Sequence, residues 1–356
     1  MHLKKSKGKW SDTRFWVMIG IFVLALILFH DRPQIAMWIG FILAGYSAIA
    51  NDSIQTLGTF ISSNSKVKWW VLWLYLGGIL VAVFTYGWMQ GDIAFERLTK
   101  IPEVTDFNFW QLFAPVALLV LTQFRMPVST TFLLLSVFSS SKTVGSMLNK
   151  TFIGYFVAFV SAFVIWGVIA ELMKHKKFFK EKYNKKTWRV FQWFATAYLW
   201  STWLMQDTAN IVVFLPRDLP KEFFLAVIIL MFLGMGFLLY IRGGRIQEII
   251  TEKTDVADVR SASIIDLVLG TLLLIFKEWN NLPMSTTWVF LGLLAGREIA
   301  LSRLSGNEKP YLRTLGLVTK DLAFASIGIV VSIAIAVAAN GDFQLSEIVG
   351  VLNIFR

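Results

Sequence analysis

The sequence has no cysteine, only three histidines and few charged residues. Without cysteine there can be no disulfide framework, no thiol catalysis and no cysteine-ligated metal. Charged residues make up 16% of the chain, whereas an ordinary soluble domain carries about 25%. Together with 56% hydrophobic residues and a mean hydropathy of +0.61, this composition excludes an ordinary soluble enzyme.

Apolar runs that approach the length of a membrane span, roughly 20 residues, occupy 15–29, 35–50, 69–89, 152–173, 190–205, 223–241 and 322–339. Helices are expected there, because a helix satisfies its own backbone hydrogen bonds in lipid. The net charge of +11 lies mainly in short segments just outside these runs. That placement favours a topology signal over nucleic-acid binding.

The two densest basic stretches, the N-terminal tail and residues 174–189, are expected in the cytoplasm. No small-residue cleavage site follows the first apolar run, so a cleaved signal peptide is not expected. These signals predict a cytoplasmic tail with an extra transmembrane helix (1–34), a first repeat (35–173), a basic linker (174–189), a second repeat (190–339) with a cytoplasmic interfacial segment (242–262), and a C-terminal tail (340–356).

Two signatures occur twice in the same order. An aspartate lies in an apolar run at Asp52 and again at Asp207, and the string Pro-x-Ser-Thr-Thr begins at Pro127 and again at Pro283. The aspartates are 155 residues apart and the turns are 156 residues apart. Two dissimilar motifs kept in register predict one duplication. The charge placement makes the two copies antiparallel in the membrane.

Each Pro-x-Ser-Thr-Thr turn separates two apolar pieces that are short for a span: 109–122 and 128–139 in the first copy, 264–276 and 284–295 in the second. Both pairs are predicted to form re-entrant hairpins that enter from opposite faces, so that their tips meet near the midplane. Secondary transporters commonly have this arrangement. The predicted fold is an all-α polytopic membrane protein of inverted-topology repeats, each with an interrupted Asp-bearing helix and a re-entrant helical hairpin.

The aspartates predict an ion site. Asp52 follows fifteen residues without a charge, and a carboxylate so deep in lipid is costly unless it has a partner. Neighbouring side-chain oxygens, such as those of Asn51, Gln55 and Asn210, would suit a hard monovalent cation, and the carboxylate could instead take a proton. The alternative is a hydrogen-bonded cluster that packs the helices.

The two turns predict an anion site. Proline starts or stops a helix, and serine and threonine are good N-terminal caps. A helix N-terminus offers free N–H groups to phosphate or sulfate, although ordinary capping is the alternative. The candidate oxyanion-binding residues are Ser129, Thr130, Thr131, Ser285, Thr286 and Thr287.

Three charged residues near the turns have open roles. Arg125 and Lys277 could attract an anion, but pairing of Lys277 with Glu278, or contact with water, is equally open. Asp266 lies near the start of the second hairpin, where a boundary position is expected rather than a ligand role.

These motifs resemble the inorganic phosphate transporter (Pit) family of sodium–phosphate symporters, which also includes bacterial sulfate permeases. That family carries a Gly-Ala-Asn-Asp-Val-Ala-Asn type signature in each inverted half, with Pro-x-Ser-Thr-Thr-His turns. The resemblance covers roughly residues 35–339. It implies that the Ser-Thr-Thr turns hold the oxyanion and that coupling cations bind at Asn51, Asp52, Gln55, Gln206, Asp207 and Asn210.

The sequence departs from the family at four positions. Gln55 and Gln206 replace asparagines, and Phe132 and Trp288 follow the two Ser-Thr-Thr triplets, where histidine is frequent. The amide changes leave the choice between Na⁺ and H⁺ open, with Na⁺ at Asp52 and Asp207 if the transport is sodium-coupled. The aromatic replacements leave phosphate and sulfate open within the class of tetrahedral oxyanions.

The expected function is cation-coupled symport of inorganic phosphate by alternating access, with a sulfate or related oxyanion permease as the alternative. A passive anion channel is a further alternative. An intramembrane aspartyl protease is disfavoured because no Gly-x-Gly-Asp string occurs, so no enzyme activity is expected. The expected partners are phosphate or sulfate and membrane lipid, without nucleic acid or an organic cofactor; a homodimer is left open. The expected location is a bacterial inner membrane, with the N-terminus in the cytoplasm.

Overall fold

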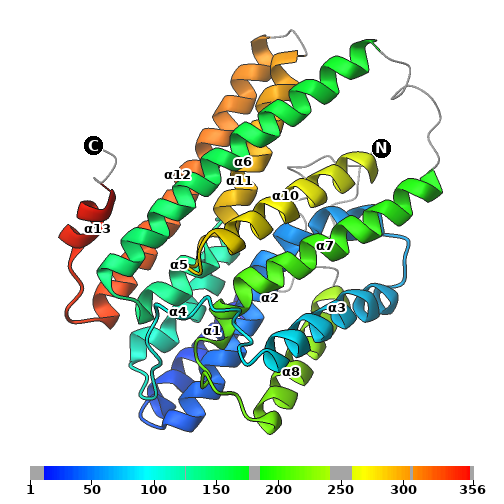
Figure 1. Ribbon diagram of the computed structural model, residues 1–356. Helices are drawn as coiled ribbons and strands as arrows, with labels where there is room; N and C mark the ends of the chain where they lie inside the picture. Colours follow the sequence, from blue (N-terminus) through cyan, green and yellow to red (C-terminus); the bar gives the residue numbers. More distant parts are fainter. Residues whose placement is uncertain (1–11, 125, 176–184, 241–258, 305–307, 353–356) are drawn as a thin grey trace.

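The computed structural model describes residues 12–124, 126–175, 185–240, 259–304 and 308–352, in which the regular elements are helices joined by loops, without strands (Figure 1). In chain order the elements are α1 (Asp12–Phe29), α2 (Pro33–Ser63), α3 (Trp69–Met89), α4 (Phe109–Gln123), α5 (Thr130–Leu135), the 3₁₀ helix η1 (Ser136–Phe138), α6 (Ser141–His175), α7 (Lys185–Val212), α8 (Lys221–Tyr240), α10 (Val259–Trp279), α11 (Thr286–Leu304), α12 (Glu308–Ala339) and α13 (Leu345–Leu352).

Within the described residues, six helices contain a stretch long and apolar enough to cross a membrane. These stretches are Pro33–Asn51, Trp69–Met89, Ser141–Ile169, Lys221–Tyr240, Val259–Trp279 and Tyr311–Ala339. Shorter apolar stretches occur at Phe15–Phe29 in α1 and in α4. The prediction of an all-α, multi-pass membrane protein is confirmed.

The first hairpin, α4 followed by α5 and η1, begins at a well-formed cap. The Asn108 side chain accepts a hydrogen bond from the Gln111 backbone N–H, and the Gln111 side chain accepts one from the Asn108 N–H, both at 3.0 Å. The far end of the hairpin returns to this point. The Gln111 side chain also donates to the Val137 carbonyl (3.4 Å), and the Phe107 and Phe138 rings lie 6.3 Å apart. The chain therefore turns back between α4 and α5, as predicted.

The second hairpin, α10 and α11, is longer than predicted. Its helices span 21 and 19 residues, and the prediction of two short pieces at 264–276 and 284–295 is wrong in length. The Arg297 side chain of α11 donates to the Ser261 hydroxyl near the start of α10 (3.4 Å), so the open end of this hairpin also closes on itself. In Figure 1 α11 runs upward from the level of α5, whereas α4 lies below it.

Glycines let α11 lie against α6 with almost no gap. A Cβ atom added at Gly292 or Gly296 would collide with the backbone carbonyl oxygen of Tyr155 or Phe159, respectively. This Gly-x-x-x-Gly spacing places both glycines on one face of α11, the small-residue arrangement that lets membrane helices approach closely. The close contact fixes the position of the second hairpin along the long helix α6.

Three predictions need correction or fall outside the described residues. The predicted interruption of the Asp-bearing helices is wrong, because the backbones of α2 and α7 stay helical through Asp52 and Asp207. The predicted C-terminal tail contains α13, whose buried Ile348 packs near Gly145 of α6. The linker 174–189 and the segment 242–262 are described only at their edges, at the ends of α6, α7 and α10.

Candidate functional site

Each Ser-Thr-Thr triplet begins a helix, as predicted. The Ser129 hydroxyl accepts a hydrogen bond from the Phe132 backbone N–H at 3.2 Å, and the Ser285 hydroxyl accepts one from the Trp288 N–H at 3.3 Å. The serine is thus the cap in both copies, at the start of α5 and of α11. Because the serines cap, the two threonines that follow each one are left to face other elements.

The tips of the two hairpins are in direct contact. The Thr131 hydroxyl donates to the Met284 carbonyl at 3.2 Å, and the Thr287 hydroxyl donates to the Val128 carbonyl at 3.4 Å. All six hydroxyl residues of the triplets are buried. The predicted contact between the two turns is therefore observed, and it is buried. Its position at the midplane and the entry of the hairpins from opposite faces stay predictions.

Asp207 of α7 joins the two triplets through its carboxylate. One oxygen accepts from the Thr131 hydroxyl (3.3 Å) and from the Asn210 amide (2.9 Å), and the other accepts from the Thr286 hydroxyl (2.5 Å). The side chain has no exposed surface. A single buried carboxylate therefore accepts hydrogen bonds from both hairpin tips.

Asn51 of α2 lies on the other side of the same cluster. Its amide donates to the Val128 carbonyl at 3.0 Å and to the Thr130 hydroxyl at 3.3 Å. The Asn210 amide likewise donates to the Thr131 hydroxyl at 3.2 Å. The predicted amides of α2 and α7 thus both contact the first triplet. The side chains of Asp52 and Gln55, one residue and four residues further along α2, lie outside the described part of the structure.

Two amide oxygens beside Asp207 are buried without a hydrogen-bond donor among the described residues. They are Oε1 of Gln206 and Oδ1 of Asn210. The other end of the Gln206 amide donates to the Leu273 carbonyl at 2.6 Å, so its orientation is fixed. Buried acceptors are rarely left unpaired. Carboxylate and amide oxygens are the donors that a hard cation prefers, so the residue types at Gln206, Asp207 and Asn210 have the chemistry of the sodium site that the sequence resemblance implies.

The other charged candidates have different outcomes. Lys277 forms an ion pair with Glu278 at 2.8 Å near the surface, which is one of the alternatives that the sequence leaves open. Arg125 lies outside the described residues. The boundary position expected for Asp266 is wrong. Its carboxylate is fully buried and accepts hydrogen bonds from Thr59 of α2 (3.1 Å) and Thr196 of α7 (2.5 Å).

Sequence reasoning missed three buried cations, Arg97, Lys150 and Arg297. Lys150 directly precedes the apolar run 152–173 and reads as an ordinary flanking charge. Arg97 stands in a loop of mixed charge. The missed signal for Asp266 was available, because it interrupts an apolar stretch in the same way as Asp52 does.

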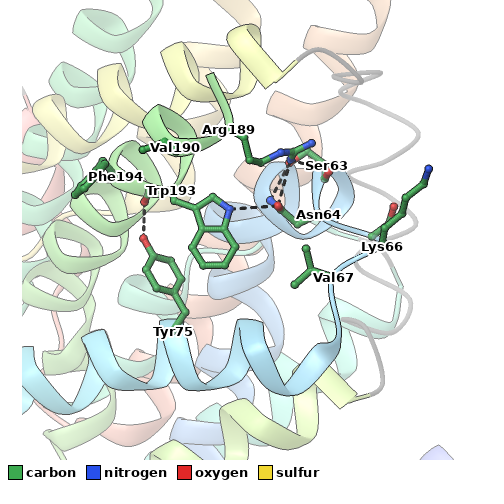
Figure 2. Close-up of a pocket in the computed structure, with 10 residues that line it drawn as sticks. Ser63, Asn64, Lys66, Val67, Tyr75, Arg189, Val190, Trp193 and Phe194 are labelled. Atoms are coloured by element: carbon green, nitrogen blue, oxygen red, sulfur yellow. Dashed lines mark hydrogen bonds between the residues drawn. The ribbon is translucent and has the colours of Figure 1, made fainter. Parts of the chain in front are cut away.

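A surface cavity of about 710 Å³ lies away from the triplets, between the end of α2, the start of α3 and the start of α7 (Figure 2). Arg189 reaches across it to the Ser63 carbonyl at 2.8 Å, and Tyr75 donates to the Trp193 carbonyl at 2.5 Å. By contrast, the cavity beside Thr286 and Thr287 measures about 10 Å³. Cavity size is a poor guide to the site here, because the buried polar side chains of the triplets and Asp207 contact one another directly and leave almost no open space beside Thr286 and Thr287.

The apolar stretches and the two buried hairpins define an all-α, multi-pass membrane protein. No protein-family model matches the sequence, and no curated protein matches it. A solved structure described as the sodium-dependent phosphate transporter is similar to this chain, with a TM-score of 0.59 and 15% sequence identity. The match covers 91% of this chain and 99% of that chain, so the likeness of fold extends over nearly the whole molecule.

Proposed function

We propose that this protein is a secondary active transporter that carries inorganic phosphate, or a related tetrahedral oxyanion such as sulfate, together with Na⁺ or H⁺. The observation that carries this proposal is the buried Asp207 carboxylate, which accepts hydrogen bonds from Thr131 of one hairpin and Thr286 of the other. The fold shared with a sodium-dependent phosphate transporter supports it.

The oxyanion is held by neutral donors in this proposal. The hydroxyls of Thr130, Thr131, Thr286 and Thr287 surround the contact between the tips, and none of the six triplet residues is more than 6% exposed. A dehydrated anion needs such donors, because burial without hydrogen bonds is prohibitive. The serines support the site indirectly, since they hold the helix starts in place.

The coupled cation offsets the repulsion between the oxyanion and the Asp207 carboxylate. Two like charges about 4 Å apart repel by roughly 4 kcal/mol at the effective dielectric of a protein. An oxyanion that takes the Thr131 and Thr286 hydroxyls from Asp207 would meet that repulsion. A Na⁺ ion between the carboxylate and the unpaired oxygens of Gln206 and Asn210, or a proton on the carboxylate, removes it. Anion and cation therefore bind best together, which is the thermodynamic basis of symport.

Alternating access follows if the two hairpins act as separate gates. Each hairpin closes one side of the tip contact, and release of either would open the site to one face. In this proposal the halves are inverted repeats, the N-terminus is cytoplasmic and the protein resides in the inner membrane of a bacterium.

The test is uptake of labelled phosphate and sulfate into proteoliposomes, with and without a gradient of Na⁺ or H⁺. Asp207→Asn should abolish the dependence on the cation, and the pair Thr131→Ala, Thr286→Ala should abolish uptake. Thr319→Ala is a matched control, because the Thr319 residue is exposed on α12 and its hydroxyl, among the described residues, bonds only to the Leu315 carbonyl of its own helix. The proposal fails if the two site variants transport as well as the parent.

The same assay separates a carrier from a channel. A symporter accumulates its anion against a gradient when the cation gradient is applied, whereas a channel only equilibrates it. Competition by unlabelled phosphate, sulfate and arsenate identifies the oxyanion.

A further inference from the structure

Arg97 is buried in a loop that has an unusual backbone. The loop joins α3 to α4, and its residues Phe95 and Glu96 have positive φ angles of 53° and 63°. The Asp92 carboxylate stabilises this path by accepting hydrogen bonds from the Ala94 and Glu96 backbone N–H groups, at 2.7 and 2.6 Å. The chain is thereby turned inward at Arg97, whose side chain is only 1% exposed.

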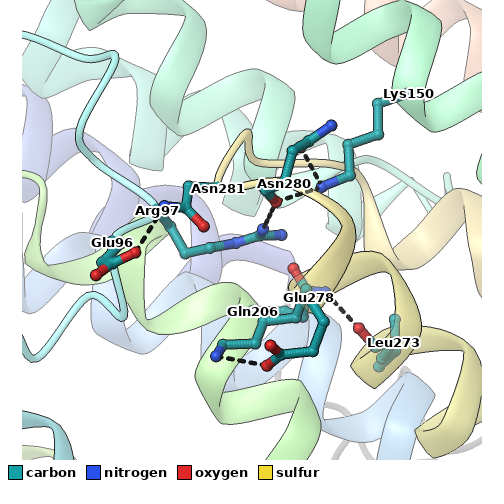
Figure 3. Close-up of polar contacts among 9 residues, drawn as sticks. Glu96, Arg97, Lys150, Gln206, Leu273, Glu278, Asn280 and Asn281 are labelled. Atoms are coloured by element: carbon teal, nitrogen blue, oxygen red, sulfur yellow. Dashed lines mark hydrogen bonds and ion pairs between the residues drawn. The ribbon is translucent and has the colours of Figure 1, made fainter.

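Lys150 of α6 approaches the same point, and the two side chains are named here the cation pair. Arg97 donates to the Asn280 carbonyl at 3.1 Å, and Lys150 donates to that carbonyl at 2.9 Å (Figure 3). Lys150 also donates to the Asn280 side chain (2.7 Å) and to the Leu282 carbonyl (2.8 Å). All of these acceptors lie in the turn between α10 and α11.

The cation pair has no anionic partner among the described residues. Both side chains bond only to neutral oxygens, and Lys150 is 4% exposed. Burial of an unpaired charge destabilises the folded protein, and two positive groups that share one carbonyl acceptor also repel each other. The neutral oxygens around the cation pair leave its positive charge without a counter-charge, and such a position attracts an anion.

The guanidinium group of Arg97 has the donors for that anion. Its Nε and Nη2 atoms are buried and have no hydrogen-bond partner among the described residues. These two N–H groups lie on one edge of the planar fork, the geometry that matches two oxygens of a phosphate or carboxylate. Lys150 has all three donors occupied, so the directed bonds to an anion come from Arg97.

The cation pair lies between the surface and the triplet site. Asn280 and Asn281 are exposed, and Asn281 donates to the Glu96 carboxylate at 2.6 Å. Five residues after Asn280 the chain reaches Ser285 and the second triplet. Burial lowers the pKa of Arg97 to about 10, and the negative charge of Asp207 opposes that shift.

We propose that Arg97 and Lys150 form a second anion site, where a tetrahedral oxyanion binds before it moves to the threonine hydroxyls at Asp207. This inference rests on the proposed function, since it names a docking position for the same substrate. It requires no change in the hydrogen bonds that hold the Asn280 turn, because the anion takes the free edge of Arg97.

The test is a titration of the purified protein, in neutral detergent, with inorganic phosphate. Asp207→Asn should leave binding at the cation pair, and Arg97→Lys should remove it, because lysine keeps the charge and can still reach the Asn280 carbonyl but loses the fork.

In proteoliposomes Arg97→Lys and Lys150→Gln should raise KM about tenfold, the effect of losing roughly one hydrogen bond, with little change in kcat.

Arg217→Lys is the matched control. Arg217 is another loop arginine, half-buried where Arg97 is buried, and the carboxylate of Glu103 accepts a hydrogen bond from its backbone N–H, so KM should not change. A titration in nanodiscs with anionic phospholipid separates the sources of phosphate: a lipid headgroup at the pair would compete with free phosphate and would overturn the docking role. Added phosphate that protects the parent but not Arg97→Lys from thermal unfolding would support it.

The outcomes separate this inference from the proposed function. If uptake is normal and both cation-pair variants keep the parent KM and phosphate binding, the second site is overturned while the transporter stands. A change in kcat and thermal stability without a change in KM or binding also overturns it, since the pair would then only hold the turn. If no uptake occurs but phosphate binding depends on Arg97, the second site stands and the proposed function fails.

Discussion

Asp207 collects donors from three elements, Thr131 of α5, Asn210 of α7 and Thr286 of α11. Asp207 and Asn210 are presented by α7, a continuous helix without glycine or proline, and not by a break in the backbone. This explains why the predicted helix interruption is absent. Side-chain hydroxyls from the hairpins, rather than unwound backbone groups, satisfy the carboxylate.

The Thr286 hydroxyl is the sharpest single-residue test of the site. Thr286→Val keeps the shape of the side chain and removes its donor, which lies 2.5 Å from Asp207. Loss of a hydrogen bond to a charged group costs about 1.5–3 kcal/mol, so kcat/KM for oxyanion uptake should fall at least about tenfold. Thr286→Ser keeps the hydroxyl and should retain most of the activity. Equal uptake by the valine and serine variants would show that the hydroxyl has no part in transport.

Asp266 offers a test of stability. Its carboxylate is fully buried, bonds to Thr59 and Thr196, and has no cationic partner among the described residues. Asp266→Asn keeps both contacts, because a hydroxyl can donate or accept, and removes the buried charge. The midpoint of thermal unfolding, followed by tryptophan fluorescence in detergent, should stay level or rise.

The comparison variant is Asp266→Ala, which leaves both threonine hydroxyls without this acceptor and should cost about 1–3 kcal/mol. If Asp266→Asn is destabilised as much as Asp266→Ala, the charge itself contributes to the fold and a cation must bind beside it.

At the residue scale, the sequence identifies the site residues that belong to duplicated motifs and misses those that occur only once. The duplicated motifs located Asp207, Asn51 and both triplets. Arg97 has no such mark, because its burial depends on positive φ angles at Phe95 and Glu96, two residue types that do not favour them.

At the scale of elements, hydropathy predicts the positions of the helices but gives the wrong length for some of them, such as α10 and α11. The run 69–89 coincides with α3, whose faces are apolar throughout. Hydropathy gives the wrong lengths for α10 and α11, because polar residues such as Ser263 and Arg297 lie in those helices and are buried against protein rather than lipid. A window that measures affinity for lipid cannot see polar groups that a neighbouring helix covers.

The contact between α6 and α11 predicts an effect of a single methyl group. Gly296→Ala would force its Cβ into the Phe159 carbonyl, and overpacking of this kind costs typically 1–3 kcal/mol. The unfolding midpoint in detergent should fall. Gly167→Ala, at a position of α6 with open space around it, is the control and should be neutral or stabilising. A Gly296→Ala variant as stable as the parent would mean that the two helices separate easily.

On the scale of the whole molecule, the two hairpins meet at one buried contact and are held at different places. The Asn280 turn is held from outside its own hairpin by Glu96, Arg97 and Lys150. If alternating access moves the second hairpin relative to the loop between α3 and α4, these contacts must separate in each cycle. A covalent link across them should therefore stop transport in one state.

The chain has no cysteine, so the link can be made without background. Glu96→Cys with Asn281→Cys, joined by a short bis-methanethiosulfonate reagent, should lose phosphate uptake and regain it after reduction. Phosphate binding to the linked protein should persist, because the reagent ties a surface contact and leaves the triplets and Asp207 intact. Each single-cysteine variant treated with the same reagent is the control for simple blockage. Undiminished uptake by a fully linked protein would place the moving gate elsewhere, at the first hairpin alone.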